Sequence, residues 1–131
     1  MPTMPPCRRA ALLNPLPLPT LALPMPESAL VALTTLATEA EARALVTALL
    51  EARLIACGTL IPGARFIYRW EGAVTEEAEV VVLLKTDDSK WDALCGAVRE
   101  RHPYQVPELL ALPVEHGLDL YLSWLTNEVV G

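Results

Sequence analysis

The chain has few cysteines, few basic residues and no long apolar run, and each shortage argues against a class of protein. Its 131 residues include three cysteines and no CxxC pair, which argues against a secreted disulfide scaffold. Ten basic residues face sixteen acidic ones, for a net charge of −6, and they form no cluster suited to nucleic acid. The longest strictly apolar runs, such as residues 80–84, are too short to cross a bilayer. We therefore expect a cytoplasmic protein with reduced, buried thiols and with neither nucleic acid nor membrane as a partner.

Apolar residues, in contrast, are abundant. They make up 53% of the chain, which excludes a disordered protein. A chain of this length predicts one domain with a sizeable core. So high an apolar content in a protein without membrane spans also suggests that some apolar surface is covered by further copies of the chain.

The chain divides into two segments of different composition. Residues 1–26 hold eight of the twelve prolines and only two charged residues, Arg8 and Arg9. Closely spaced prolines disfavour helices and central strands, so we expect an extended or disordered arm. Removal of residues 1–24 is then expected to leave stability and assembly nearly unchanged. Residues 27–131 hold all sixteen acidic residues and form the predicted folded domain.

Hydrophobic periodicity predicts the first half of this domain. Residues 29–36 are apolar and suit a buried strand, and Thr38 with Glu41 is typical of a capping box that opens a helix. Residues 55–71 form a long strand, bent at residues 62–63, and Glu71-Gly72 is the expected turn into a strand that ends near Thr86. Because both faces of that last strand are apolar, we expect it to be central in its sheet.

The second half of the domain repeats the pattern. Ser89 with Asp92 is expected to open a second helix, which Pro103 ends. A strand at residues 108–114 and a final helix follow. The order βαββαβ plus a terminal helix predicts an α+β, ferredoxin-like antiparallel sheet with both main helices on one face. The other face is apolar and uncovered, and another subunit is the expected cover.

Several polar and aromatic groups are candidate functional residues. His102, Tyr104 and Glu108 lie close together on a proline-rich loop and suit a metal or an anion; alternatively, a cationic His102 caps the preceding helix. Residues 66, 68 and 70 are aromatic and share one strand face, either as a ligand platform or as interface residues. The acidic run at residues 76–79 is interpreted as a solvated turn.

Together these motifs resemble the CutA family of divalent-cation tolerance proteins. The resemblance covers about residues 29–126 and rests on Ala56-Cys57, Leu60-Ile61-Pro62-Gly63, Ile67-Tyr68-Arg69-Trp70-Glu71-Gly72, Leu84-Lys85-Thr86, His102-Pro103-Tyr104, Pro107–Val114 and Tyr121–Leu125. It implies a PII-like protomer in a tight homotrimer, a role in tolerance of copper and other divalent ions, no enzymatic activity and no required cofactor.

The resemblance also implies metal ligands that this chain only partly keeps. The ligands proposed in copper-binding members are a cysteine late in the first strand and paired histidines before the Pro-Tyr. Here those positions carry Thr34, Arg101 and His102. Only the histidine is a good copper ligand. With Glu108 nearby, we expect a weak copper site at most.

Two other functions remain open at this point. One is a PII-like signalling module that binds a small anion in clefts between subunits, lined by Trp70, Glu71, Lys85 and Tyr104, with Arg65 or Arg69 as anion partners. The other is a hydrolase, for which the sequence offers no recognisable pair of nucleophile and base.

Overall fold

A four-stranded antiparallel sheet organises the protein, whose structure is a computed structural model that describes Cys7 and residues 28–130. The elements in chain order are β1 (Ala29–Leu36), α1 (Glu39–Glu51), β2 (Cys57–Trp70), β3 (Ala73–Asp87), the short 3₁₀ helix η1 (Asp88–Lys90), α2 (Trp91–Arg101), β4 (Leu110–Pro113) and α3 (Asp119–Glu128). The strand order is β2-β3-β1-β4. The expected α+β, ferredoxin-like and PII-like fold is confirmed, with β3 in the interior of the sheet.

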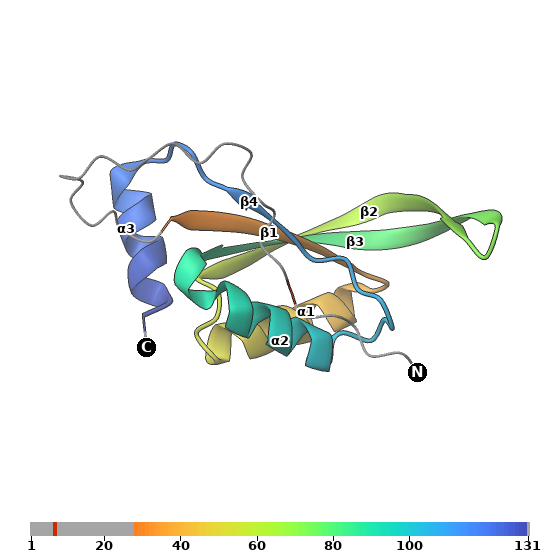
Figure 1. Ribbon diagram of the computed structural model, residues 1–131, viewed down its shortest axis with the longest axis horizontal. Helices are drawn as coiled ribbons and strands as arrows, with labels where there is room; N and C mark the ends of the chain where they lie inside the picture. The colour runs from red at the N-terminus through yellow and green to blue at the C-terminus, as the bar shows by residue number, and fades with distance from the viewer. Residues whose placement is uncertain (1–6, 8–27, 131) are drawn as a thin grey trace.

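The two longer helices cover one face of the sheet (Figure 1). The α1 helix begins as expected, because the Thr38 hydroxyl accepts the Glu41 amide hydrogen at 3.1 Å. Helical spacing then gives each helix one buried stripe. These stripes meet the alternating side chains of β1 and β3 to form the main core, which contains Leu45, Leu49, Leu94, Val98, Leu36, Val82 and Leu84.

Two element boundaries differ from the sequence-based expectations. Asp87, rather than Ser89, supplies the cap after β3, because its carboxylate accepts the Ser89 amide hydrogen at 2.9 Å. This cap opens η1, and α2 follows at Trp91 with no side-chain cap of its own. The β4 strand is also shorter than predicted and covers residues 110–113.

The β2–β3 hairpin extends past α1 and α2 as a two-stranded arm (Figure 1). Its turn is the expected Glu71-Gly72, where both residues have positive φ, 50° and 80°. Near the body Ile61 pairs with Val81, whereas in the arm Ala64 pairs with Glu79. One extra residue therefore lies in β2 between these pairs, which forms a β-bulge at the bend predicted for residues 62–63.

The sheet face opposite α1 and α2, called here the open face, is only partly covered. The α3 helix packs on one end of it, where Leu125 and Val129 contact Ala29 and Ala56. Strand alternation places Ile61, Leu110 and Leu112 on the same face, and these side chains are 45%, 61% and 60% exposed. Within residues 28–130, no helix is both long and apolar enough to cross a membrane.

The pairing of the cysteines differs from the expectation of three reduced thiols. Cys7 forms a disulfide with Cys95 of α2, with their Cα atoms 6.0 Å apart and a sequence separation of 88 residues. The interpretation as three reduced thiols is therefore wrong for this pair, and Cys57 alone is free. Cys7 also packs against the main core, so this residue of the arm contacts the folded domain without belonging to a helix or strand. The remainder of the arm, and its predicted disorder, lies outside the described residues.

Candidate functional site

His102 lies where α2 ends and joins that helix to β1. It is the C-cap residue, its amide hydrogen bonds the Val98 carbonyl at 2.8 Å, and its side chain is 6% exposed. The ring Nε2 lies 2.8 Å from the Thr35 carbonyl oxygen, and the Tyr104 amide donates to Nδ1 at 3.1 Å. Because an amide can only donate and a carbonyl can only accept, the ring carries its proton on Nε2.

This arrangement makes His102 neutral. Burial lowers the pKa of the imidazole, an effect that the Thr35 carbonyl and the Glu41 carboxylate only partly oppose. The prediction that His102 is the C-cap of α2 is confirmed. The idea that a positively charged ring stabilises the helix by interacting with its dipole is wrong, because the ring is neutral. Both ring nitrogens already have hydrogen-bond partners, so neither presents a free lone pair.

The other residues at the proposed metal position offer few ligands. The Thr34 hydroxyl is buried and has no hydrogen-bond partner among the described residues, and a neutral hydroxyl is a poor copper ligand. Arg101 is exposed, and Glu108 is half-buried on the loop before β4. In the part of the chain that the structure describes, no three His, Cys, Asp or Glu side chains lie close enough to hold a metal ion together.

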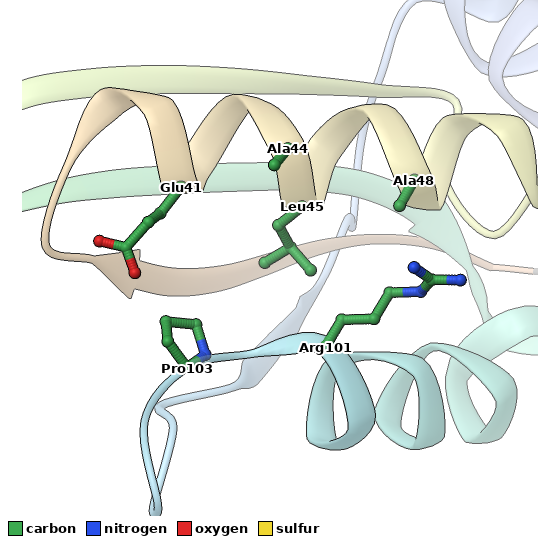
Figure 2. A pocket seen from close by; sticks show the side chains of 6 residues that line it. All are labelled: Glu41, Ala44, Leu45, Ala48, Arg101 and Pro103. Carbon is green, nitrogen blue, oxygen red and sulfur yellow. The ribbon is translucent and has the colours of Figure 1, made fainter.

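Arg101 lies beside a groove between α1 and the end of α2. The groove has a volume of about 420 Å³ and is lined by Glu41, Ala44, Leu45, Ala48, Arg101 and Pro103. In Figure 2 the guanidinium extends toward Ala48, and the Glu41 carboxylate lies nearer Pro103. The two charged groups flank an apolar floor, at separate ends of the groove.

A second cavity lies on the open face of the hairpin arm and is called here the aromatic cavity. It has a volume of about 360 Å³ and is lined by Phe66, Tyr68, Trp70, Glu77, Glu79 and residues 104–106. The Phe66 and Tyr68 rings stack with centroids 4.6 Å apart. The Tyr104 hydroxyl donates to the Glu79 carboxylate, whose two oxygens lie 3.0 and 2.9 Å away. This bond joins the loop after α2 to the base of the arm.

The electrostatic environment of the aromatic cavity is negative. Burial raises the pKa of Glu79, its bond from Tyr104 lowers it, and the carboxylates of Glu77, Glu108 and Glu41 raise it further. Burial and the bond to Glu79 likewise raise the pKa of the Tyr104 phenol well above its usual range. None of the described residues that line this cavity is Lys, Arg or His.

Comparison with known proteins identifies the family. A sequence model of the CutA1 divalent ion tolerance proteins matches residues 30–128, which is most of the chain. The chain belongs to the CutA1 family. It is 48% identical to the divalent-cation tolerance protein CutA of Pectobacterium atrosepticum over 97 residues, which cover 74% of this chain and 88% of that protein. The corresponding Salmonella newport protein is 50% identical over 97 residues, with 74% and 84% covered.

A solved CutA1 structure agrees with this assignment. The divalent cation tolerance protein of Thermus thermophilus superposes with a TM-score of 0.74 at 42% identity, and the match covers 76% of this chain and 97% of that one. The matched span of the CutA1 family contains His102, Tyr104 and the whole β2–β3 arm.

Within this single chain, the four residues proposed for an anion cleft between subunits do not come together. Trp70 and Tyr104 both line the aromatic cavity. Glu71 lies at the tip of the arm. Lys85 lies near the opposite end of β3 and donates to the Thr59 hydroxyl at 2.6 Å. The twelve residue-to-residue steps along β3 from Ala73 to Lys85 span roughly 40 Å.

The sequence interpretation missed Glu79 as part of a site. It treated residues 76–79 as a solvated turn, yet Glu79 is 3% exposed and holds Tyr104. Strand alternation was the available signal, because it places Glu77 and Glu79 on one face. The bond to Tyr104 depends on the path of a distant loop and could not be predicted from that pattern.

Proposed function

We propose that this chain acts in divalent-cation tolerance without enzymatic turnover, and that it binds copper weakly at most. Family membership supports the tolerance role. The single observation behind the weak affinity is the His102 ring, whose two nitrogens are both hydrogen-bonded. A copper ion at Nδ1 must displace the Tyr104 amide, and leaving a buried donor without a partner costs about 1–3 kcal/mol.

Calorimetric titration with Cu²⁺ tests this proposal. We expect weak binding to the wild type, tighter binding to Arg101→His, which removes a repelling charge and adds an imidazole, and no binding to His102→Ala. His116→Ala is the matched control, because His116 is highly exposed and its only ion-pair partner among the described residues is its neighbour Glu115. Submicromolar affinity that survives His102→Ala would contradict the proposal and direct attention to Cys57 and Glu108.

We also propose that the protein is a homotrimer, as the family resemblance implies. Support comes from the open face, where Ile61, Leu110 and Leu112 are exposed, and from β2 and β4, which are both edge strands. Exposed apolar side chains and unpaired strand edges are features that further copies of a chain commonly cover.

Light scattering tests the assembly. We expect a mass three times that of the 14.3 kDa chain, and a monomer for Leu112→Lys, which places a charge on the open face. Ile67→Lys is the control, because Ile67 is similarly exposed but lies on the opposite face of the arm. A wild-type monomer at micromolar concentration would overturn the proposal.

The anion-binding alternative gains no support from the cavity that Trp70 and Tyr104 share. Two carboxylates and no cationic side chain line it among the described residues, and such a surface repels anions.

The expectation of a cytoplasmic location was based on three reduced thiols. The Cys7–Cys95 disulfide no longer supports that location, because disulfides persist mainly in oxidising compartments.

A further inference from the structure

We propose that residues 1–6 of this chain dock in the groove between α1 and the end of α2, called here the helix groove. The groove belongs to the layer of helices, which covers the sheet face opposite the open face (Figure 1). The assembly proposed above covers the open face and does not require this groove. The inference goes beyond metal tolerance and rests on the anchor at Cys7, the path of the chain and the polarity of the groove.

The disulfide fixes one point of the arm close to the helix groove. The Cα atom of Cys7 lies 6.0 Å from that of Cys95, and Cys7 packs against the core cluster that contains Leu45. Leu45 also lines the groove. Arg101, on the other side of the groove, follows Cys95 by six residues in the same helix, a rise of about 9 Å. Because six extended residues span up to about 20 Å, residues 1–6 have the length to reach the groove.

The path of the chain favours residues 1–6 over the residues after Cys7. Residues 8–27 connect Cys7 to Ser28, which directly precedes β1. The groove lies near the other end of β1, because Glu41 belongs to the first turn of α1, which follows that strand. The eight residues of β1 separate these two ends by roughly 25 Å. Residues 1–6 precede the anchor and do not make this connection.

The groove and residues 1–6 match in polarity. The floor of the groove consists of three apolar side chains that project from α1: Ala44, Leu45 and Ala48 (Figure 2). Residues 1–6 are Met-Pro-Thr-Met-Pro-Pro and carry no charged side chain, and methionine adapts well to irregular apolar surfaces. Arg8 and Arg9, in contrast, would lose hydration over such a floor, which is costly for a charged group.

The composition and the anchor of residues 1–6 also lower the cost of docking. Three prolines among six residues restrict the backbone, so binding has fewer conformations to order. A short tether to Cys7 gives the segment an effective concentration on the order of millimolar at the groove. An apolar contact that is too weak to form between separate molecules is therefore populated within the chain.

Methyl NMR of the full oxidised chain tests the proposal, with the methyl groups of methionine, alanine and leucine labelled. We expect nuclear Overhauser cross-peaks between the methyl group of Met4 and those of Leu45 and Ala48. Met25 is the internal control, because it closely precedes Ser28 in sequence. Its methyl group should show no cross-peak to Leu45 or Ala48.

One variant and its control test the groove. Ala44→Lys places a charged side chain at an exposed position of the groove floor and should abolish the Met4 cross-peaks while leaving circular dichroism unchanged. Thr47→Lys is the matched control, because Thr47 is exposed on the same helix and is not among the described residues that line the groove. It should keep the Met4 cross-peaks of the wild type.

A second pair of variants tests the anchor. Cys7→Ser leaves residues 1–6 attached to the folded domain only through residues 8–27, so the effective concentration falls roughly as the −3/2 power of tether length. The Met4 cross-peaks should then weaken several-fold. Cys57→Ser removes the free thiol and keeps the disulfide, and its cross-peaks should match those of the wild type.

Four outcomes would overturn the proposal. Absence of cross-peaks from Met4 to Leu45 and Ala48 in the oxidised wild type is the first. Cross-peaks from Leu12 or Leu13 in their place would assign the groove to the segment after Cys7. Met4 cross-peaks that are equally strong in Ala44→Lys would show that the groove does not hold residues 1–6. Cross-peaks found only between separately labelled copies would show that a neighbouring copy supplies the segment.

Discussion

His102 links three parts of the chain through one ring. Its backbone caps α2, its Nε2 holds the Thr35 carbonyl of β1, and its Nδ1 holds the amide of Tyr104. Tyr104 in turn bonds Glu79 on β3. The orientation of the loop after α2 therefore depends on a neutral imidazole.

This dependence predicts a loss of stability in mild acid. The pKa of His102 is lowered in the folded protein, so below about pH 6.5, the usual value for histidine, the unfolded chain binds more protons than the folded one. The contribution is complete above that pH and is lost as the pH falls through the lowered pKa. Each unit of lowering corresponds to about 1.4 kcal/mol.

Urea denaturation at pH 8 and pH 5, at fixed protein concentration, measures this effect. His102→Gln keeps a donor for Thr35 but does not titrate, and it should lose less stability than the wild type over this interval. The raised pKa of Glu79 acts in the opposite direction, but it is common to both proteins and cancels in the comparison. An equal loss of unfolding free energy between pH 8 and pH 5 in the wild type and in His102→Gln would show that His102 does not cause the pH dependence.

Sequence reasoning reached only part of this residue-level description. Pro103 directly after His102 predicts the helix end, because the residue before a proline disfavours helical geometry. The protonation state could not be predicted, because it depends on a carbonyl 67 residues away.

The contact of β2 with α1 depends on a glycine. A Cβ atom at Gly58 would lie 2.8 and 2.9 Å from the two γ-carbons of Val46. Gly58→Ala should therefore destabilise the protein by about 1–3 kcal/mol, the usual effect of overpacking. In urea denaturation, the double variant Gly58→Ala/Val46→Ala should lose less unfolding free energy than the sum of the losses of the two single variants. If it loses as much as that sum or more, steric overlap with Val46 is not the cause.

Gly96 in α2 is the matched control for this substitution. A Cβ atom there has no neighbour within 4 Å in the described part of the chain, and alanine is favoured over glycine in a helix by about 0.5–1 kcal/mol. Gly96→Ala should therefore be neutral or stabilising.

The elements were predictable where one strong local pattern dominates. The alternation of apolar residues predicted the long strands, and the Glu71-Gly72 pair predicted the turn between β2 and β3. The start of α2 was not predictable, because Asp87 and Ser89 are both good caps and the structure uses Asp87. Alternation alone predicted that the aromatic residues 66, 68 and 70 share one strand face, but the closeness of Glu79 to the loop that carries Tyr104 required the tertiary structure.

At the scale of the whole molecule, the Cys7–Cys95 disulfide closes a long loop. Cross-linking residues 88 apart restricts the unfolded chain, and the chain-entropy model gives about 3–5 kcal/mol for such a loop. Cys7→Ser should lower the unfolding free energy by this amount under oxidising conditions. Removal of residues 1–24 should do the same, which reverses the expectation drawn from composition, because the removed segment contains Cys7.

Denaturation with and without dithiothreitol measures the effect, with Cys57→Ser as the control for loss of a thiol. The wild type and Cys7→Ser should have nearly equal stability once reduced. Equal stability of the two oxidised proteins would show that the bond does not contribute. The sequence could not predict this pairing, since separation along the chain does not indicate which cysteines meet in space.

The bulge in β2 has a consequence for insertions and deletions. The register between β2 and β3 in the arm differs by one residue from the register in the body of the sheet. The extra residue of β2 at the bulge accounts for this difference. Losing one codon at Pro62 or Gly63 would make the ladder regular and leave every side chain on its present face. Losing one at Ile67 instead would turn Phe66 toward the helix side and bring Arg65 beside Glu77. Viable length variants of this hairpin should therefore cluster at the bulge.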